Sequence, residues 1–443
     1  MTERKQYRAI KGTRDILPPD SALWNWFEQK AREVFESYNF REIRLPIFEQ
    51  TDLFARSVGA DTDIVSKEMF TFRLSEGFQS AAKAEEDQPA LGEQVSLRPE
   101  ATASTMRAYI EHNMQALPGN VKLYCMGPMF RRERPQKGRY RQFYQINAEV
   151  LGQSDAPAID AEVLEMMMTF FQRVGLTRTT LYINSIGDNN CRPQYVELLR
   201  AELRKVKDQL GPDSQRRIET NPLRVLDSKV SNEQEIIASL PRISDHLCAE
   251  CRDHFTKLKE ELTLREVVYE ENWRLVRGLD YYTRTTFEVV AEGLGSQNAV
   301  CGGGRYDGLV ELLGGPPTKG IGFAIGSDRA ILSTQESGNL PKLPGLNVFV
   351  AWMGQPTYPA AVAIARTLRG AGFSVELPGE ETKFKKSLNL ADKLGARYAL
   401  IIGSDEVVAG TFTLKRLADG EQKKLSEYDL LEYLESERRG TQG

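Results

Sequence analysis

Apolar side chains near the start of the chain follow two different periods. Between residues 22 and 38 they recur close to the helical period, which predicts an amphipathic helix, at Leu23, Trp26, Phe27, Val34 and Tyr38. Over residues 41–47 they alternate with polar residues, which predicts a strand with one buried face. Pro46 has no N–H to donate within a sheet, so we expect this strand at a sheet edge or at a contact between subunits.

Two further strand-like segments, 121–130 and 143–150, flank a basic loop and predict a hairpin. In the returning strand, a period of two places Gln145, Asn147 and Glu149 on one face and apolar side chains on the other. The hairpin therefore combines a basic tip with a stripe of polar side chains.

The rest of the chain divides into blocks of different character. We expect a mobile loop at 81–95, a core helix rich in Met and Phe at 160–174, strands at 285–291, 301–307 and 320–326, and a linker at 333–345. Residues 187–268 are charged and helical and interrupt the strand-rich part, which predicts an inserted helical module. Residues 346–443 alternate strand and helix, as in a small separate α/β domain.

Composition excludes several classes of protein. The 443 residues are 41% apolar and 27% charged, the N-terminus is polar, and no segment has the length of apolar sequence that a membrane helix needs. We therefore expect a cytoplasmic, multi-domain protein that does not enter a membrane. The net charge of −4 argues against indiscriminate binding of nucleic acid but leaves room for local basic patches.

The five cysteines are scattered, as in a protein with reduced thiols. Cys248 and Cys251 have the spacing of zinc ligands, and His246, His254 or Cys191 could add to them. A structural zinc normally needs four ligands, however, and the chain has a single CxxC pair. The sequence therefore favours a helical turn with two free thiols, and we expect no metal site.

Arginines are the side chains that best indicate what the chain could bind. The glycine-rich runs match neither a P-loop nor a Rossmann fingerprint, and the three histidines have no recognisable nucleophile or metal setting. Six of the eleven residues from 131 to 141 are basic, which is typical either of a solvated loop or of a nucleic-acid contact. Guanidinium groups suit phosphate and carboxylate oxygens, and the arginines that gather in the motif-like segments are Arg98, Arg131, Arg134, Arg139, Arg277, Arg305 and Arg329.

Several of these segments resemble a known family. Residues 96–102 (SLRPEAT) with 130–135 (FRRERP) resemble motif 2 of class II aminoacyl-tRNA synthetases, 320–329 resembles motif 3, and 41–59 resembles motif 1. Residues 275–283 (LVRGLDYYT) and 301–307 (CGGGRYD) are similar to two signatures of the histidyl-tRNA synthetase family. The similarity follows the family's order over nearly the whole chain.

The resemblance implies an α+β fold. Its catalytic core is an antiparallel sheet flanked by helices, formed by 1–186 and 269–332. A helical insertion (187–268) and a C-terminal α/β anticodon-binding domain (346–443) complete the chain. Motif 1 implies a homodimer.

The resemblance also implies a substrate set. Glu100, Thr102 and Gln145 would meet the ammonium group of L-histidine, and Glu149 would accept from its imidazole. The implied histidine-binding residues are Glu100, Ala101, Thr102, Gln145, Glu149, Arg277, Tyr281 and Tyr282. Two positions depart from the family's pattern, since Ala101 stands where glycine is common and Asp328 where glutamate is usual.

For ATP, the resemblance implies Arg131 and Arg329 on the phosphates, with Mg²⁺ accompanying the triphosphate and no prosthetic group. Arg277 would contact the α-phosphate and the histidine carboxylate, so Arg277 and Arg131 are the implied catalytic residues. The acceptor end of tRNA(His) would meet the loop that contains Arg134, Gln136, Lys137 and Arg139.

The implied reaction is the ATP-dependent attachment of histidine to tRNA(His) through histidyl-adenylate. The alternative is a synthetase-like regulatory subunit of ATP phosphoribosyltransferase, which binds histidine without charging tRNA. Such paralogues generally lack the C-terminal domain and lose catalytic arginines, whereas this chain keeps Arg131, Arg277, Arg329 and residues 346–443. A sensor of uncharged tRNA is disfavoured because kinase signatures are missing from the sequence. Other class II synthetases are disfavoured by RGLDYYT.

Overall fold

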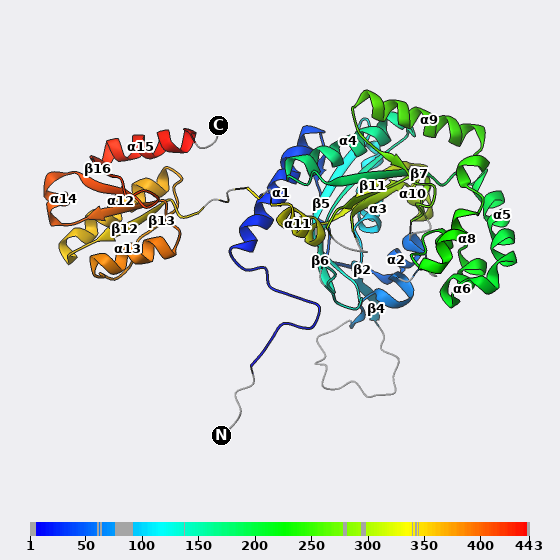
Figure 1. Ribbon diagram of the computed structural model, residues 1–443, viewed down its shortest axis with the longest axis horizontal. Coiled ribbons are helices and arrows are strands. Elements are labelled where there is room, and N and C mark those ends of the chain that lie inside the picture. The colour runs from blue at the N-terminus through cyan, green and yellow to red at the C-terminus, as the bar shows by residue number, and fades with distance from the viewer. Residues whose placement is uncertain are drawn as a thin grey trace, which may run out of the picture. The chain divides into compact units, whose positions relative to one another are not determined.

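The chain forms two compact units, Met1–Pro341 and Lys342–Gly443. The computed structural model describes residues 6–59, 62, 64–75, 92–136, 138–277, 281–293, 298–338, 340–341, 343 and 345–440. Figure 1 labels the helices and strands of both units. No helix among these described residues is long and apolar enough to cross a membrane.

The first unit is built on an eight-stranded sheet in the order β1-β5-β6-β11-β10-β9-β7-β8. Its strands are β1 (Arg41–Glu42), β5 (Val121–Phe130), β6 (Gln142–Gly152), β7 (Thr179–Ser185), β8 (Glu270–Glu271), β9 (Thr283–Ala291), β10 (Ala299–Arg305) and β11 (Lys319–Gly326). Neighbouring strands are antiparallel except at the two edges, where β1 with β5 and β7 with β8 are parallel. The predicted antiparallel core and the predicted β5–β6 hairpin are both confirmed.

Helices α1 (Asp20–Ser37) and α4 (Pro157–Arg173) supply the aromatic side chains that pack on this sheet. Phe27 of α1 meets Phe170 of α4 with ring centroids 5.0 Å apart, and Phe35 meets Phe323 of β11 at 5.9 Å. All four side chains are buried. The Met and Phe positions of the predicted helix are therefore core positions, as expected.

The single strand predicted over 41–47 is wrong. Only Arg41–Glu42 pairs with the sheet, and the following residues are irregular until β2 (Phe48–Gln50). The buried guanidinium of Arg98 donates to the carbonyl oxygens of Leu45 (3.1 Å) and Pro46 (3.3 Å), so these oxygens do not bond to a neighbouring strand. β1 does lie at an edge of the sheet, as expected from Pro46.

Strand β2 belongs to a separate three-stranded sheet with the order β2-β4-β3. Strand β3 is Thr71–Ser75 and β4 is Gly92–Leu97, and helices α2 (Thr51–Val58) and α3 (Thr102–Glu111) belong to the same part of the chain. Residues 92–95 of the predicted loop are thus strand, because they pair with β3. Residues 81–91 lie outside the described residues.

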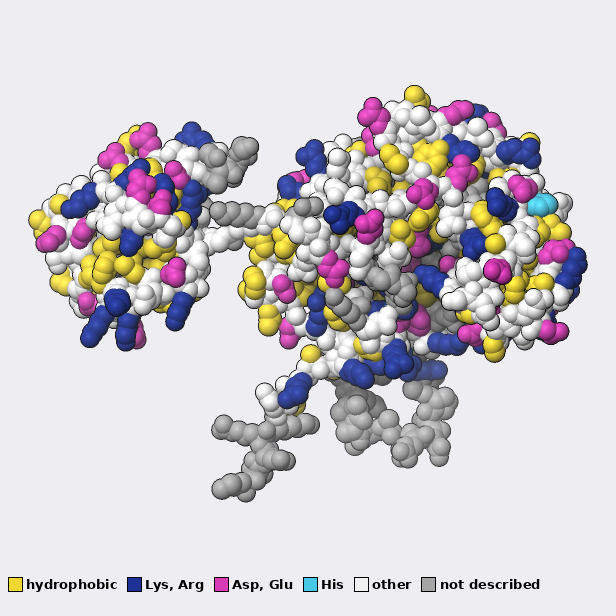
Figure 2. Space-filling model, in the orientation of Figure 1, with side chains coloured by type: hydrophobic (Ala, Val, Ile, Leu, Met, Phe, Trp, Pro, Cys, Tyr) yellow, Lys and Arg dark blue, Asp and Glu magenta, His cyan; other side chains and the backbone are white. Residues whose placement is uncertain are grey.

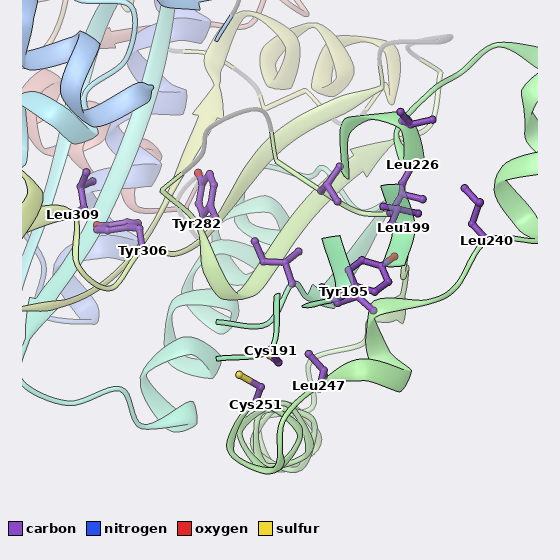
Figure 3. Close-up of a cluster of buried hydrophobic side chains, with 14 of the residues drawn as sticks. Cys191, Tyr195, Leu199, Leu226, Leu240, Leu247, Cys251, Tyr282, Tyr306 and Leu309 are labelled. Atoms are coloured by element: carbon purple, nitrogen blue, oxygen red, sulfur yellow. The ribbon is translucent and has the colours of Figure 1, made fainter. Parts of the chain in front are cut away.

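The segment between β7 and β9 is mainly helical, as predicted. It contains α5 (Arg192–Lys205), α6 (Pro212–Thr220), α7 (Leu223–Leu226), α8 (Gln234–Ala238) and α9 (Ala249–Leu264). Figure 1 shows α5, α6 and α8 gathered at one side of this unit, while α9 packs on α4. Leu199, Leu226 and Leu240 share one buried cluster with Tyr282 and Tyr306 of the sheet region (Figure 3).

Two short features complete the first unit. Helix α10 is Leu309–Leu312 and helix α11 is Ser327–Glu336. Because α11 continues through Glu336, the first four residues of the predicted linker 333–345 are helical.

The second unit carries a five-stranded sheet in the order β13-β12-β14-β15-β16. Its elements are β12 (Val348–Trp352), α12 (Tyr358–Gly370), β13 (Val375–Glu376), α13 (Phe384–Lys393), β14 (Tyr398–Ile402), α14 (Ser404–Ala409), β15 (Phe412–Arg416), β16 (Gln422–Leu425) and α15 (Glu427–Gly440). Strands β13, β12 and β14 are parallel, and β15 and β16 continue the sheet antiparallel. Helices α14 and α15 and strand β16 were not predicted from the sequence.

Candidate active site

The polar stripe of β6 faces a row of small residues on β11. The register pairs Glu149 with Gly322 and Asn147 with Ala324. A Cβ atom at Gly322 would lie 2.6 Å from Cδ of Glu149 and 2.5 Å from the carbonyl oxygen of Ala148. Only glycine at this position leaves room for the Glu149 side chain.

A cavity of about 150 Å³ opens beside this stripe. Seven of the predicted site residues line it, namely Glu100, Thr102, Arg131, Gln145, Arg277, Tyr281 and Tyr282, together with Asn147, Gly302, Tyr306, Gly322, Phe323 and Ala324. Neither Ala101 nor Glu149 is among the lining residues; Glu149 lies behind Thr102 and Tyr306, which line the cavity and donate to its carboxylate. The side chain of Ala101 packs on Cys125 and Met129 in a buried cluster, so its methyl group faces the core.

Glu149 is enclosed by two hydroxyl groups. Thr102 donates to one carboxylate oxygen at 2.7 Å, and Tyr306 donates to the other. Burial raises the pKa of Glu149 to about 8, although both hydrogen bonds act to lower it. The described neighbours of Glu149 include no cation within ion-pair distance, so a donor on a ligand would stabilise its ionised form.

Glu100 lies at the start of α3. Its two carboxylate oxygens accept from the backbone N–H groups of Thr102 (2.6 Å) and Ala103 (2.9 Å). This is a favourable place for a carboxylate, because N–H groups at a helix start lack partners within the helix. Burial nevertheless raises the pKa of Glu100 above its ordinary value, and these hydrogen bonds oppose that shift.

Three tyrosines close one side of the cavity. The rings of Tyr281 and Tyr282 have centroids 4.6 Å apart, and Tyr281 meets Tyr306 edge-on at 5.7 Å. The sequence contained Tyr306 within a family signature but did not predict it as a site residue. Its hydroxyl contact with Glu149 depends on strands that are distant in the sequence.

Three buried polar atoms of the cavity have no hydrogen-bond partner among the described residues. They are Oε1 of Gln145, Nδ2 of Asn147 and Nε of Arg277. Buried polar atoms are normally satisfied, and an unsatisfied one costs roughly 1–3 kcal/mol. Two donors and one acceptor left open in one cavity indicate that it binds a polar ligand.

A second cavity of about 290 Å³ adjoins the first. Its basic residues are Arg131, Arg139, Arg277 and Arg329, and its flat side chains include Tyr140, Phe143 and Tyr144. Burial lowers the pKa of Arg329, and the nearby Arg139 and Arg131 lower it further. Crowded positive charges of this kind favour an anionic ligand.

The two cavities share Arg131, Gln145, Arg277, Gly302 and Ala324. Backbone contacts hold Arg131, whose Nε donates to the carbonyl oxygen of Pro99 at 2.9 Å. Arg277 lies over Gly302, where a Cβ atom would come within 2.6 Å of the guanidinium carbon. Both guanidinium groups therefore lie where a ligand in one cavity would meet a ligand in the other.

Two arginines of the predicted cluster have structural roles. Arg98 donates to the carbonyl oxygen of Pro128 at 2.9 Å as well as to the 45–46 segment. Arg305 is buried and pairs with Asp160 and, at 2.9 Å, with Asp307. Neither residue lines either cavity, so these two arginines support the fold and do not face the site.

The basic hairpin tip is a tight turn. Gln136 and Arg139 exchange two backbone hydrogen bonds of 3.0 and 2.9 Å, and the Arg139 guanidinium pairs with Glu133. The side chains of Arg134 and Gln136 are exposed. Lys137 lies outside the described residues.

Comparisons with known proteins agree with this geometry. A family model described as histidyl-tRNA synthetase matches residues 12–330, and one described as an anticodon binding domain matches residues 347–437. The histidine–tRNA ligase of Solibacter usitatus is 52% identical over 97% of this chain and 99% of that protein. That of Koribacter versatilis is 52% identical over 96% of each.

Solved structures give the same result. The crystal structure of apo S. aureus histidyl-tRNA synthetase matches with a TM-score of 0.77 and 36% identity, covering 97% of this chain and 100% of that one. A Bacillus halodurans structure titled ATP phosphoribosyltransferase regulatory subunit/histidyl-tRNA synthetase matches with a TM-score of 0.62 over 90% of this chain and 99% of that one, and at 18% identity it supports the fold alone. The full-length relatives favour the ligase over the regulatory alternative. On these matches the chain belongs to the histidyl-tRNA synthetase family of class II aminoacyl-tRNA synthetases.

Proposed function

We propose that the two joined cavities are where this ligase activates its amino acid. The chain attaches L-histidine to tRNA(His) with ATP, through histidyl-adenylate. Histidine occupies the smaller cavity and ATP the larger one. The observation that carries this assignment is the pair of arginines, Arg131 and Arg277, at the junction of the two cavities.

Histidine fits the polar groups of the smaller cavity. Its imidazole N–H donates to Glu149, whose two oxygens already accept from Thr102 and Tyr306. An apolar side chain in its place would leave this buried carboxylate short of a donor, which supports selection for imidazole. The ammonium group meets Glu100 and the open acceptor of Gln145, and Tyr281 and Tyr282 cover the ligand.

ATP fits the larger cavity. Arg131 and Arg329 bind the phosphates, and the flat faces of Phe143 and Tyr144 suit a purine ring. Arg131 lies over the Phe143 ring with its guanidinium carbon 5.2 Å from the centroid, which fixes the guanidinium plane.

In the first step the histidine carboxylate attacks the α-phosphorus, and pyrophosphate leaves. Negative charge grows on the non-bridging phosphate oxygens, and the side chains of Arg277 and Arg131 stabilise it without transferring a proton. The acyl group then passes to a terminal ribose hydroxyl of tRNA. The reaction needs positioning and fixed charge, which is consistent with a cavity that contains no histidine among its described lining residues.

Mg²⁺ enters with ATP as part of the substrate. The two acidic side chains among the described residues of the larger cavity are already paired, Glu133 with Arg139, and Asp328 with Arg14 (2.7 Å) and the N–H of Tyr144 (2.8 Å). Phosphate oxygens and water are therefore its main ligands. Asp328 instead accepts the backbone hydrogen bond from Tyr144, which orders the start of β6.

Two surfaces suit tRNA. The exposed Arg134 and Gln136 of the hairpin tip, with Arg139 and Lys137, contact the acceptor end. In the C-terminal unit, Figure 2 shows Lys and Arg side chains gathered over α13, the helix that begins at the exposed Phe384. Phe412, in contrast, is buried in the core of that unit and cannot stack on a base.

We further propose a cytoplasmic homodimer. Four large apolar side chains are exposed on and beside the small sheet, Ile47 and Phe48 in motif 1 and Phe72 and Leu74 on β3. An apolar patch of this kind, next to the sheet edge at β1, is typical of a subunit interface. The location follows from the substrates, since tRNA and ATP are drawn from the cytoplasm, and size-exclusion chromatography with light scattering tests the dimer.

Amino-acid-dependent exchange of pyrophosphate into ATP tests the proposed function. Exchange should require histidine and should not be supported by the other amino acids. Exchange driven by a different amino acid would contradict the assignment of the smaller cavity.

A further inference from the structure

A cluster of metal-ligating side chains lies outside the active site, in the helical insertion. Asp188, Cys191, Cys248 and Cys251 each offer one ligand atom, and these four atoms all lie within 4.8 Å of one another. Figure 3 shows the side chains of Cys191 and Cys251 next to each other. We propose that this cluster is a structural Zn²⁺ site with three thiolates and one carboxylate.

The distances fit tetrahedral coordination. Sγ of Cys191 lies 3.6 Å from Oδ1 of Asp188, and Sγ of Cys248 lies 3.9 Å from the same oxygen. Zinc binds thiolate sulfur at about 2.3 Å and carboxylate oxygen at about 2.0–2.2 Å, so neighbouring ligands of one ion lie roughly 3.4–3.8 Å apart. A soft, sulfur-rich donor set of this size favours zinc over magnesium or calcium.

The backbone presents these side chains in a fixed geometry. The CxxC pair opens α9, where the N–H of Cys251 points to Sγ of Cys248 at 3.5 Å. The other pair comes from the turn between β7 and α5, which is made possible by Gly187 with φ of +65°. A Cβ atom at Gly187 would lie 2.7 Å from Sγ of Cys191, so a larger residue would displace this ligand.

The surroundings are those of a supported metal site. Cys191 and Cys251 are buried, and the free oxygen of Asp188 faces the guanidinium of Arg284 at 3.5 Å. Such contacts to a ligating carboxylate are typical of metal sites. The histidines that the sequence offered as further ligands do not take part: His254 instead contacts the carbonyl oxygen of Asp155 at 3.0 Å.

The site would hold the two ends of the insertion together. Cys191 precedes α5 and Cys248 precedes α9, so one ion joins the segment that leaves the sheet to the segment that returns to it. Arg192, the neighbour of Cys191, donates to the carbonyl oxygen of Tyr282 in the active site. Zinc therefore stabilises the insertion and, through Arg192, the position of Tyr282.

Metal analysis of the full-length protein, purified without a metal column or chelator, tests the proposal. We expect about one zinc per chain in the wild type and in the Cys125→Ala control, which removes a buried cysteine of β5. Zinc should be nearly lost in the Cys191→Ser and Cys251→Ser variants. Equal zinc content in all four proteins, or its absence from the wild type, would overturn the proposal.

Two further measurements do not depend on a destabilised variant. Wild-type protein reconstituted with Co²⁺ should show thiolate-to-cobalt charge transfer and the intense visible bands of tetrahedral coordination, and weak octahedral bands would contradict the site. The Asp188→Cys variant, which offers a fourth thiolate, should release zinc to a chelator more slowly than the wild type. Faster release, or a disulfide among the three cysteines in the native protein, would also overturn it.

Discussion

Gly322 of β11 offers a sharp test of the histidine pocket. Replacing it with alanine adds one methyl group, which would lie 2.6 Å from Cδ of Glu149 and 2.5 Å from the backbone oxygen of Ala148. Ordinary carbon–carbon contacts are about 3.5–4.0 Å, so the Glu149 carboxylate must move by roughly 1 Å or more. Gly322→Ala therefore displaces the group proposed to accept from imidazole, while leaving its chemistry unchanged.

The expected cost has two parts. A hydrogen bond to a charged group is worth about 1.5–3 kcal/mol, so losing it raises the KM for histidine by about 10- to 150-fold. Pressing β6 away from β11 at Ala148 is overpacking, which costs about 1–3 kcal/mol of folding stability. The KM for ATP should change little, because the partners of Glu149, Thr102 and Tyr306, line the smaller cavity and not the larger one.

Pyrophosphate exchange, run with histidine and ATP varied separately, measures both constants. Gly326→Ala is the matched control on the same strand, because its Cβ atom would have only the carbonyl oxygen of Val300 near it, at an ordinary 3.8 Å. The control should keep the KM for histidine of the wild type. Thermal melting of both variants separates a local effect from unfolding.

A Gly322→Ala enzyme with a KM for histidine within about twofold of the wild type would refute this reasoning. The loss of a hydrogen bond to a charged group should raise that KM by more. An equal rise in the KM for ATP and for histidine would also count against it. That result would point to a distorted sheet shared by both cavities.

Three further predictions follow from the same geometry. Arg277→Ala should retain most of its affinity for histidine in calorimetry but lose about 10²–10³-fold in the rate of adenylation measured by exchange, because its guanidinium acts on charge that develops in the transition state. Because burial raises the pKa of Glu149 to about 8 and imidazole binds to the ionised form, the KM for histidine should fall about fivefold from pH 7 to pH 8 and about twofold more above pH 8, and Glu149→Gln should abolish this dependence. A chain ending at residue 345 should lose far more tRNA aminoacylation than pyrophosphate exchange, and equal losses would mean that residues 346–443 support the core.

Periodicity in the sequence was enough for the elements that bury one face. The hairpin of β5 and β6 and helices α1 and α4 form where apolar residues recur with the expected period. Strands β12 and β14 form instead at continuous apolar runs, because all of their residues are buried. The segment 41–47 also has a strand period, but the guanidinium of Arg98 donates hydrogen bonds to the carbonyl oxygens of Leu45 and Pro46. A side chain distant in the sequence therefore decided the local structure, and no local pattern could predict that.

The sequence likewise predicted only part of the candidate site. The signature segments contain Glu100, Arg131 and Arg277, which line one cavity, because the resemblance carries tertiary information that composition lacks. Gln145 lines the same cavity from the polar stripe of β6. The neighbouring Ala101 faces the core, where it packs with Cys125 and Met129. For the proposed zinc site, the sequence offered Cys191 as a ligand beside the CxxC pair but not Asp188, because Asp188 lies in a turn that is distant in the sequence from that pair.

Charge balance separates Arg305 from the lining of the larger cavity. Burial acts to lower the pKa of Arg305, but Asp160 and Asp307 outweigh it and raise that pKa overall, so its charge is neutralised within the fold. The described lining of the larger cavity, in contrast, holds four arginines and two acidic residues, Glu133 and Asp328, the latter also paired with Arg14 outside it. The excess positive charge matches the magnesium complex of ATP, whose net charge is roughly −2. The positive charge that remains in this lining is thus what the proposed nucleotide would balance.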